Sequence, residues 1–324
     1  MKTVTILAYK DALATSITGT ADLFAMAGVI WQRIHGEPQT PMFKVQIATL
    51  DGNPVQCANG ITLNAHCSLE DVKHSDLLFI PTMVGRIDTT LSENKGLFPI
   101  IQRLLQQGCD IASNDTGAFL LAEAGILNGK KATTHWGFTE LFHQRYPNVL
   151  LEPAQLITAD GNIFCSGGGM AWLDLGIFLM ERYYGHDVAK QTAKAFVIDV
   201  GRHEQSVYSE IPGKKYHQDT DILKIQEWLE QHYAERINLD GLAEKFALST
   251  RTFKRRFKLA TQDTPLQYLQ RIRIDAAKKH LENSRKPIDT IASLVGYMDQ
   301  SAFAKLFKRE TGLTPGEYRA RFRK

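Results

Sequence analysis

The segment Phe253-Lys254-Arg255-Arg256-Phe257-Lys258, followed by Thr264-Pro265 and Tyr268, decides the fold of the last third of the chain. It recurs 50 positions later as Phe303-Ala304-Lys305-Leu306-Phe307-Lys308, followed by Thr314-Pro315 and Tyr318. Phenylalanines four positions apart lie on one face of a helix, so each copy predicts a helix with an apolar face and a polar face. The repeat therefore predicts two copies of one helical unit.

An apolar residue and an alanine open a shorter helix before each copy, as Leu242-Ala243 and Ile291-Ala292. Ser249 is a suitable N-cap, and Gly296 suits the turn between two helices. We expect two helix-turn-helix units, at residues 239–246 with 250–259 and 288–294 with 300–310. Further helices are expected at 222–232, 265–283 and 315–322.

Charge is unevenly distributed along the 324 residues, a length that suggests two or three domains. Residues 1–212 carry a net charge of −6 and residues 213–324 carry +9, which the overall +3 conceals. A basic module with two helices that fit successive turns of the major groove, ~34 Å apart, indicates double-stranded DNA as the partner.

Composition excludes other classes of protein. No apolar run reaches the about 18 residues that a membrane span needs, so we expect no membrane contact. The four cysteines form no CxxC pair, which favours a reducing, cytoplasmic location. The sequence shows no metal-binding or cofactor-binding motif, and we expect neither a metal nor a cofactor.

The first 200 residues alternate strand and helix signals. Short apolar runs bounded by turn residues predict buried parallel strands at 4–8, 45–49, 77–81 and 111–113, with helical stretches at 20–27, 99–107 and 117–124. Ala159-Asp160-Gly161-Asn162 predicts a hairpin turn, and a long helix is expected at 170–184. The pattern predicts an α/β sandwich over 1–200, a polar linker with Pro212-Gly213 over 201–220, and a helical domain over 221–324.

Burial of the repeated phenylalanines decides which side chains of the two basic helices face outward. On the first helix we expect DNA contacts from Arg251, Thr252, Lys254 and Arg255. On the second we expect them from Gln300, Ser301, Ala304 and Lys305. Arginine can donate two hydrogen bonds to a guanine edge, whereas the second set suits adenine or thymine edges. We assign phosphate contacts to Arg256, Lys258 and Lys308.

The second copy resembles the C-terminal signature of AraC/XylS-type transcriptional regulators, through Ile291-Ala292, Gly296-Tyr297, Ser301, Phe303, Phe307-Lys308, Gly312, Thr314-Pro315 and Tyr318-Arg319. The resemblance covers residues 221–322. It implies a sequence-specific DNA-binding regulator, an activator and a homodimer, with RNA polymerase as a further candidate partner. The first copy departs from the pattern at Gln262-Asp263, where the family has glycine and an apolar residue.

The stretch Ile111-Ala112-Ser113-Asn114-Asp115-Thr116-Gly117 has the strand-turn-helix order of a nucleophile elbow. With Lys131-Ala132-Thr133-Thr134-His135-Trp136 it resembles the ThiJ/PfpI branch of the class I glutamine amidotransferase-like fold. More narrowly, it resembles GlxA-type regulators, which fuse this flavodoxin-like parallel-sheet domain to an AraC-type DNA-binding domain. The run from Asp160 to Gly176 belongs to the same resemblance, which extends over nearly the whole chain.

One departure from that family bears on catalysis. Its enzymes carry cysteine at the elbow, where this chain has Asp115, a poor nucleophile. Ile80-Pro81-Thr82-Met83 stands where glycines usually supply oxyanion donors. We therefore expect no enzyme activity and a domain that senses a small molecule and mediates dimerisation.

The motif Gly19-Thr20-Ala21-Asp22-Leu23-Phe24 matches a family pattern whose acidic residue lies near the elbow. Asp22 and Asp115, beside His135 and Trp136, suggest a site for a small cationic metabolite that pairs with the acids and lies against Trp136. The structural alternative is that Asp115 caps a helix and Asp22 is an ordinary acid at a helix start.

Two other functions stay open. A DNA-tethered hydrolase or amidase needs a nucleophile, and neither cysteine nor serine stands at the elbow. A DNA-bound scaffold that only dimerises and senses no ligand would be favoured by an elbow pocket filled with side chains.

Overall fold

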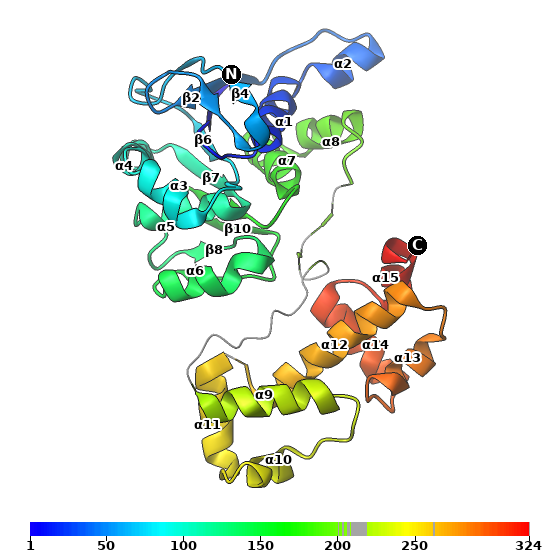
Figure 1. The fold of residues 1–324 in the computed structure, drawn as a ribbon. Coiled ribbons are helices and arrows are strands. Elements are labelled where there is room, and N and C mark those ends of the chain that lie inside the picture. Colours follow the sequence, from blue (N-terminus) through cyan, green and yellow to red (C-terminus); the bar gives the residue numbers. More distant parts are fainter. Residues whose placement is uncertain (200, 203, 206–207, 209–218, 262, 324) are drawn as a thin grey trace. The chain divides into compact units, whose positions relative to one another are not determined.

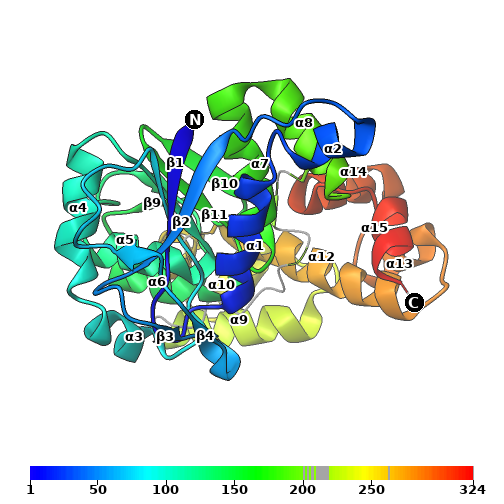
Figure 2. The same cartoon turned by 90° about the horizontal axis from the view of Figure 1, so that it is seen from above.

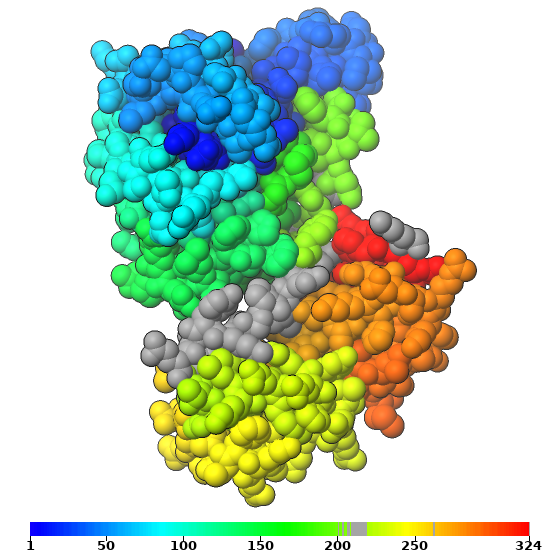
Figure 3. Space-filling model, viewed as in Figure 1, coloured from blue at the N-terminus to red at the C-terminus, as the bar shows by residue number. Residues whose placement is uncertain are grey.

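The chain forms two units in the computed structural model, Met1–Gln205 and Ser206–Lys324 (Figure 1). Figure 3 shows them in space-filling form, the first coloured blue to green and the second yellow-green to red. The structure describes residues 1–199, 201–202, 204–205, 208, 219–261 and 263–323. Much of the expected linker, including Pro212-Gly213, and Gln262 of the first copy lie outside these residues. No helix within them is long and apolar enough to cross a membrane.

A seven-stranded sheet lies at the centre of the first unit, in the order β10-β11-β7-β6-β1-β2-β5. Every neighbouring pair is parallel except the hairpin β10–β11. The strands are β1 (Lys2–Leu7), β2 (Phe43–Thr49), β5 (Cys67–Ser68), β6 (Leu77–Ile80), β7 (Asp110–Asn114), β10 (Ile157–Asp160) and β11 (Ile163–Ser166). The four parallel strands and the hairpin expected from the sequence are confirmed, whereas β5 has only two residues and gives no pattern.

Helices pack on both faces of this sheet, with α1 and α7 on one face and α4 and α5 on the other (Figure 2). The α-helices are α1 (Ala14–Ala25), α2 (Ile30–His35), α3 (Ile87–Glu93), α4 (Leu97–Gln106), α5 (Ala118–Glu123), α6 (Thr139–Arg145), α7 (Ala171–Tyr184) and α8 (His186–Ala195). Short elements complete the unit: β3 (Val55–Gln56), β4 (Thr62–Leu63), β8 (Lys131–Ala132), β9 (Leu150–Leu151), η1 (Ala58–Gly60), η2 (Asp115–Gly117) and η3 (Trp136–Phe138).

Helix α1 begins six residues before the expected start at residue 20. It continues through Gly19, which lies just before the expected start. A Cβ added at Gly19 would lie 2.4 Å from the ring of Trp172, so the glycine allows α7 to pack closely against α1. Tertiary packing thus outweighs the low helix propensity of glycine.

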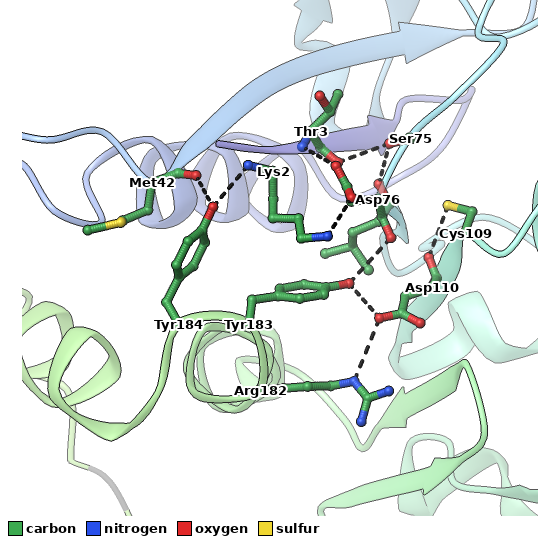
Figure 4. A network of polar contacts seen from close by, with 11 residues as sticks. Lys2, Thr3, Met42, Ser75, Asp76, Cys109, Asp110, Arg182, Tyr183 and Tyr184 are labelled. Carbon is green, nitrogen blue, oxygen red and sulfur yellow. Dashed lines mark hydrogen bonds and ion pairs between the residues drawn. The ribbon is translucent and has the colours of Figure 1, made fainter.

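A polar network fixes the C-terminal end of α7 at the edge where the parallel strands begin (Figure 4). The Tyr183 hydroxyl donates to the Asp110 carboxylate at 2.6 Å, and the Tyr184 hydroxyl donates to the carbonyl of Met42 at 2.7 Å. Lys2 pairs with Asp76 at 2.8 Å. Helix α7 therefore spans the sheet, and its N-terminal end lies at the opposite edge, where β6 and β7 end.

The second unit is helical and contains two small cores. Its helices are α9 (Thr220–His232), α10 (Leu239–Lys245), α11 (Thr250–Thr261), α12 (Pro265–Asn283), α13 (Ile288–Leu294), α14 (Gln300–Thr311) and α15 (Pro315–Phe322). The long α12 joins the cores: Tyr268 and Leu269 pack in one, Ala277 and Leu281 in the other. All seven helices expected from the sequence are confirmed.

Candidate nucleic-acid interface and elbow site

Helix α11 presents a cationic face because its apolar face is buried. Phe253 and Phe257 are fully buried, with ring centroids 5.6 Å apart. The opposite face consists of predicted DNA contacts, of which Thr252 is half-buried and the others are exposed, namely Arg251, Lys254 and Arg255. The Ser249 hydroxyl accepts a hydrogen bond from the Thr252 amide at 3.3 Å, which confirms the predicted N-cap. Three exposed cations thus lie on the face that would meet a phosphate-rich groove.

Helix α14 is held in the same way but presents fewer charges. Phe303 and Phe307 are fully buried, and Asp299 caps the helix by accepting from the amides of Ser301 at 2.8 Å and Ala302 at 3.2 Å. Of the predicted contacts, Ala304 is half-buried and three are exposed, namely Gln300, Ser301 and Lys305. Which of these side chains reads which base stays a prediction.

Arg256, a predicted phosphate contact, is bonded to acidic side chains within the protein, which argues against that role. Its guanidinium donates to both carboxylate oxygens of Asp219, at 2.9 and 2.6 Å, and to Asp221 at 2.9 Å. These acids lie at the N-terminal end of α9, so Arg256 joins the recognition helix α11 to α9. The other two predicted phosphate contacts, Lys258 and Lys308, are exposed.

The elbow of the α/β unit is formed as expected from the strand-turn-helix pattern. Asp115 follows β7 and has a φ of 58°, in the left-handed region that costs a non-glycine residue about 1–2 kcal/mol. Its backbone carbonyl accepts from the Thr134 hydroxyl at 2.9 Å. Its two carboxylate oxygens accept from the backbone amides of Thr116 at 2.6 Å and Gly169 at 2.7 Å. Asp115 thereby ties the elbow to the loop that precedes α7.

Burial governs the electrostatics of Asp115, which is 6% exposed. Burial raises the pKa of its carboxyl group, and the hydrogen bond from Gly169 and the nearby His135 oppose this shift only in part. Tyr9 is a neighbour that the sequence did not single out: burial, and then the charge of Asp115, raise the pKa of its phenol. Its position two residues after β1, at the carboxyl edge of the sheet, is the signal that could have identified it.

The backbone amides near the elbow are already bonded within the protein. The Met83 amide donates to the Thr116 hydroxyl at 3.0 Å, and the hydroxyls of Thr82 and Thr116 are 2.8 Å apart. In an acyl-transfer enzyme, such amides would point at a developing oxyanion. Here the amide of Met83 points at the hydroxyl of Thr116 instead.

The cysteines lie in surroundings that disfavour thiolates. Burial raises the pKa of the Cys109 thiol to about 12 and that of the Cys165 thiol to about 11, and it also raises the pKa of Cys57 and Cys67. Cys109 precedes β7, at the edge shown in Figure 4, whereas Asp115 follows the same strand at the other edge. Cys109 therefore cannot replace an elbow nucleophile.

His135 and Trp136 lie beside the loop that holds Asp115. Their ring centroids are 5.1 Å apart, and His135 Nδ1 accepts from the amide of Gly137 at 2.9 Å. A Cβ added at Gly168 would lie 2.0 Å from the His135 ring, so the ring packs directly on the loop backbone. The structure thus brings together three of the four predicted ligand residues.

Asp22 is the fourth, and the structure corrects its expected position. Because α1 turns Ile17, Leu23 and Phe24 inward, Asp22 lies on the exposed face of the helix. The described contacts of Asp115 do not include it. The inward polar groups of α1 are instead the hydroxyls of Ser16 and Thr20, which are buried, like the indole N–H of Trp172, without a hydrogen-bond partner among the described residues.

Comparisons with known proteins agree with this division of the chain. Residues 5–181 match the DJ-1/PfpI family, and residues 242–321 match a helix-turn-helix domain. The HTH-type transcriptional regulator CdhR of Pseudomonas aeruginosa is 26% identical over 289 residues, covering 89% of this chain and 85% of the relative. The HTH-type transcriptional regulator GlxA of Rhizobium meliloti is 24% identical over 285 residues, covering 87% and 86%.

Solved structures show the same fold for the first unit. The crystal structure of a putative transcriptional regulator protein from Vibrio parahaemolyticus superposes with a TM-score of 0.52 at 24% identity, covering 60% of this chain and 97% of that chain. The paired helix-turn-helix units, the elbow-bearing sheet and the matched families lead to one assignment. The chain belongs to the DJ-1/PfpI family and is an AraC-family helix-turn-helix transcriptional regulator with an N-terminal DJ-1/PfpI domain.

Proposed function

We propose that this regulator is an activator that binds paired DNA sites as a homodimer in the cytoplasm, under the control of a small effector bound at the elbow. RNA polymerase is a further proposed partner. The observation that carries the DNA-binding part is the outward face of two equivalently packed helices, α11 and α14, on a unit with net positive charge. Two such helices in one chain suit two successive stretches of major groove.

The proposal includes the absence of catalysis in the α/β domain. Three observations support it: an aspartate at the elbow, backbone amides already bonded to Thr116 and Asp115, and thiols whose pKa values are raised by burial. A DNA-tethered hydrolase would need a nucleophile poised beside a base, and Asp115 with both oxygens bound to amides is not poised in that way.

The effector site that we propose is bounded by Asp115, His135 and Trp136. A cationic metabolite suits it because Asp115 supplies a carboxylate and Trp136 an aromatic face. The hydroxyls of Ser16 and Thr20, which have no hydrogen-bond partner among the described residues, are further polar groups in this domain that a ligand could satisfy. In the alternative, Asp115 has only the structural role of holding the loop at Gly169, which agrees with its two amide contacts. The protein would then be a DNA-bound dimerisation scaffold that senses no ligand.

A thermal-shift assay with a panel of amines and quaternary ammonium compounds distinguishes an effector site from a purely structural role of Asp115. The proposal expects at least one compound to raise the melting temperature of the wild-type protein and to lose that effect with Asp115→Asn. The matched control is Asp22→Asn, because Asp22 is exposed on α1 and should not alter binding. If no compound acts, or if Asp115→Asn binds as the wild type does, the cationic effector is wrong.

A further inference from the structure

Arg273 of α12 contacts both helix-turn-helix units, the first formed by α10 and α11 and the second by α13 and α14. Its Nε donates to the carbonyl of Tyr233 at 2.7 Å, and its guanidinium also donates to the carbonyl of Glu235 at 2.8 Å. Both carbonyls lie where α9 is connected to α10. The guanidinium carbon lies 5.2 Å from the ring centroid of Tyr297, in the turn before the recognition helix α14. One side chain thus joins segments of both units.

The backbone of the second turn packs on the same connection. A Cβ added at Gly296 would lie 2.8 Å from the carbonyl oxygen of Ala234 and 2.9 Å from the guanidinium of Arg273. Tyr233 packs against both small cores of the helical unit. The segment between α9 and α10 and the turn between α13 and α14 are therefore in direct contact, in addition to the link that α12 provides (Figure 1).

Tyr297 connects this contact to the position of α14. Its ring is half-buried and lies 5.5 Å from the ring of Phe303, which belongs to the buried face of α14. Asp299, two residues after Tyr297, is the N-cap of the same helix. Because Tyr297 packs against α14 and lies close to its first turn, a contact that holds Tyr297 also holds the end of α14 that would enter the DNA groove first.

The contacts of Arg273 depend on the shape of its side chain as well as on its charge. A guanidinium is planar and has five N–H donors, so its edge can donate to two carbonyls while its face lies over an aromatic ring. Lysine carries the same charge, but as a compact ammonium on a flexible chain. Replacing Arg273 by lysine would therefore keep the charge and remove the fixed geometry.

We propose that Arg273 is a positioning residue that fixes α14 relative to α11 and thereby sets the spacing between the two stretches of DNA that one chain recognises. This inference rests on the proposed insertion of both helices into successive stretches of major groove. Each base pair adds ~3.4 Å and about 35° of rotation along a duplex. Two helices in a fixed arrangement therefore match one spacing, because the second helix binds at a high effective concentration only where its bases are in place.

The test uses the full-length protein and a duplex that carries one copy of the site that the wild type selects from a random library. Substitution of one base pair at a time locates the two contacted stretches. Affinity is then measured for the selected duplex, for duplexes with one base pair inserted or removed between the stretches, and for duplexes with either stretch scrambled.

Two variants change the contact from opposite sides. Arg273→Lys removes the guanidinium, and Tyr297→Leu removes the ring that it lies over. Leucine is the residue at the equivalent position of the first turn, Leu248, whose amide likewise donates to the carbonyl five residues earlier at 2.9 Å. Arg285→Lys, at an exposed arginine after α12, is the matched control.

We expect the wild type and Arg285→Lys to lose at least about tenfold in affinity when one base pair is inserted, because the two helices no longer match both stretches. Arg273→Lys and Tyr297→Leu should bind the selected duplex about three- to tenfold more weakly and lose less than about threefold more on insertion. On duplexes with one stretch scrambled, all four proteins should agree within about twofold, because only one helix then contacts its bases.

Three results would overturn the positioning role while DNA binding stands. The first is an equal loss on insertion in the wild type and both variants. The second is an equal loss on every duplex, because the change then affects folding and not spacing. The third is wild-type behaviour of Arg273→Lys, because charge alone would then be enough. If Arg273→Lys does not fold, Tyr297→Leu decides alone.

Failure of the proposed function looks different. A wild type that does not bind duplex DNA, or a selected site with only one contacted stretch, would refute the paired contact of α11 and α14 on which this inference rests.

Discussion

The two helix-turn-helix units pack corresponding aromatic rings in their interiors and differ on their outer faces. Phe257 packs on Tyr268 with ring centroids 5.3 Å apart, and Phe307 packs on Tyr318 at 5.4 Å. Thr264 and Thr314 each begin the next helix with a capping box. The residues that repeat in the sequence are therefore those that pack the cores and cap the helices. They do not indicate which DNA bases each recognition helix contacts.

The outer faces differ in charge and in the turn before each recognition helix. Helix α11 exposes Arg251, Lys254 and Arg255, whereas Lys305 is the one cation among the four predicted base contacts on α14. The turn before α11 contains Ala247 with a φ of 54°, and the turn before α14 contains Gly296 with a φ of 85°. One unit thus accepts backbone strain where the other uses glycine.

Removing a phenylalanine ring from either core should have the largest effect on stability, and the loss should be the same in the two units. Phe257→Ala and Phe307→Ala each leave a cavity in a small core, so each should lower the free energy of unfolding by about 3–5 kcal/mol. Denaturant unfolding of the full-length protein measures this. A loss under 1 kcal/mol for one of them alone would show that the two cores are not equivalent.

Replacing a cation that faces the DNA should have the next largest effect, and the effect should differ between the two units. Arg255→Ala should cost about 1–3 kcal/mol of binding and relax the preference at one base pair, since a guanine edge loses two hydrogen bonds. Lys308→Ala should weaken all sequences alike and reduce the slope of affinity against salt concentration by about one. Binding titrations over several salt concentrations compare them, and identical behaviour of both variants contradicts the assignment.

Substitutions in the two turns should change stability in opposite directions. Gly296→Ala should lower stability by about 1–2 kcal/mol, because alanine is strained at positive φ and its Cβ would lie 2.8 Å from the carbonyl of Ala234. Ala247→Gly should raise stability by up to about 1 kcal/mol, because it removes the strain at some cost in unfolded-state entropy. Thermal unfolding of the pair checks this, and the same sign for both changes would contradict it.

The smallest effect on DNA binding should come from Arg256. Arg256→Ala should lower the stability only slightly, because the ion pair with Asp219 and Asp221 is partly exposed to solvent. Affinity for DNA should change less than twofold. A loss comparable to that of Lys308→Ala would restore Arg256 as a phosphate contact.

The sequence predicted those parts of the fold that follow from local periodicity. The parallel strands, the hairpin and all seven helices of the second unit have clear apolar patterns, and the elbow follows from its strand-turn-helix order. The expected start of helix α1 was six residues too late, and the close contact of Gly19 with the ring of Trp172 is seen only in the structure. Only tertiary packing gives that information.

The candidate sites were predicted less completely, for physical reasons. A helix face shows which of its residues point outward but not whether a distant carboxylate binds them, so the ion pairs of Arg256 could not be predicted. Asp22 was placed by family resemblance, and the phase of α1 turns it outward. The departure at Asp263 is explained only in three dimensions, since Arg271 pairs with it at 2.7 Å where the second copy has Leu313.

The most direct test of the account is the affinity of the full-length protein for a selected duplex compared with a scrambled duplex at moderate ionic strength. The account predicts that the selected duplex binds at least about 10³-fold more tightly, and that replacing Arg255 removes more of this ratio than replacing Lys305. Equal affinity for the two duplexes, or no binding to either, would contradict it.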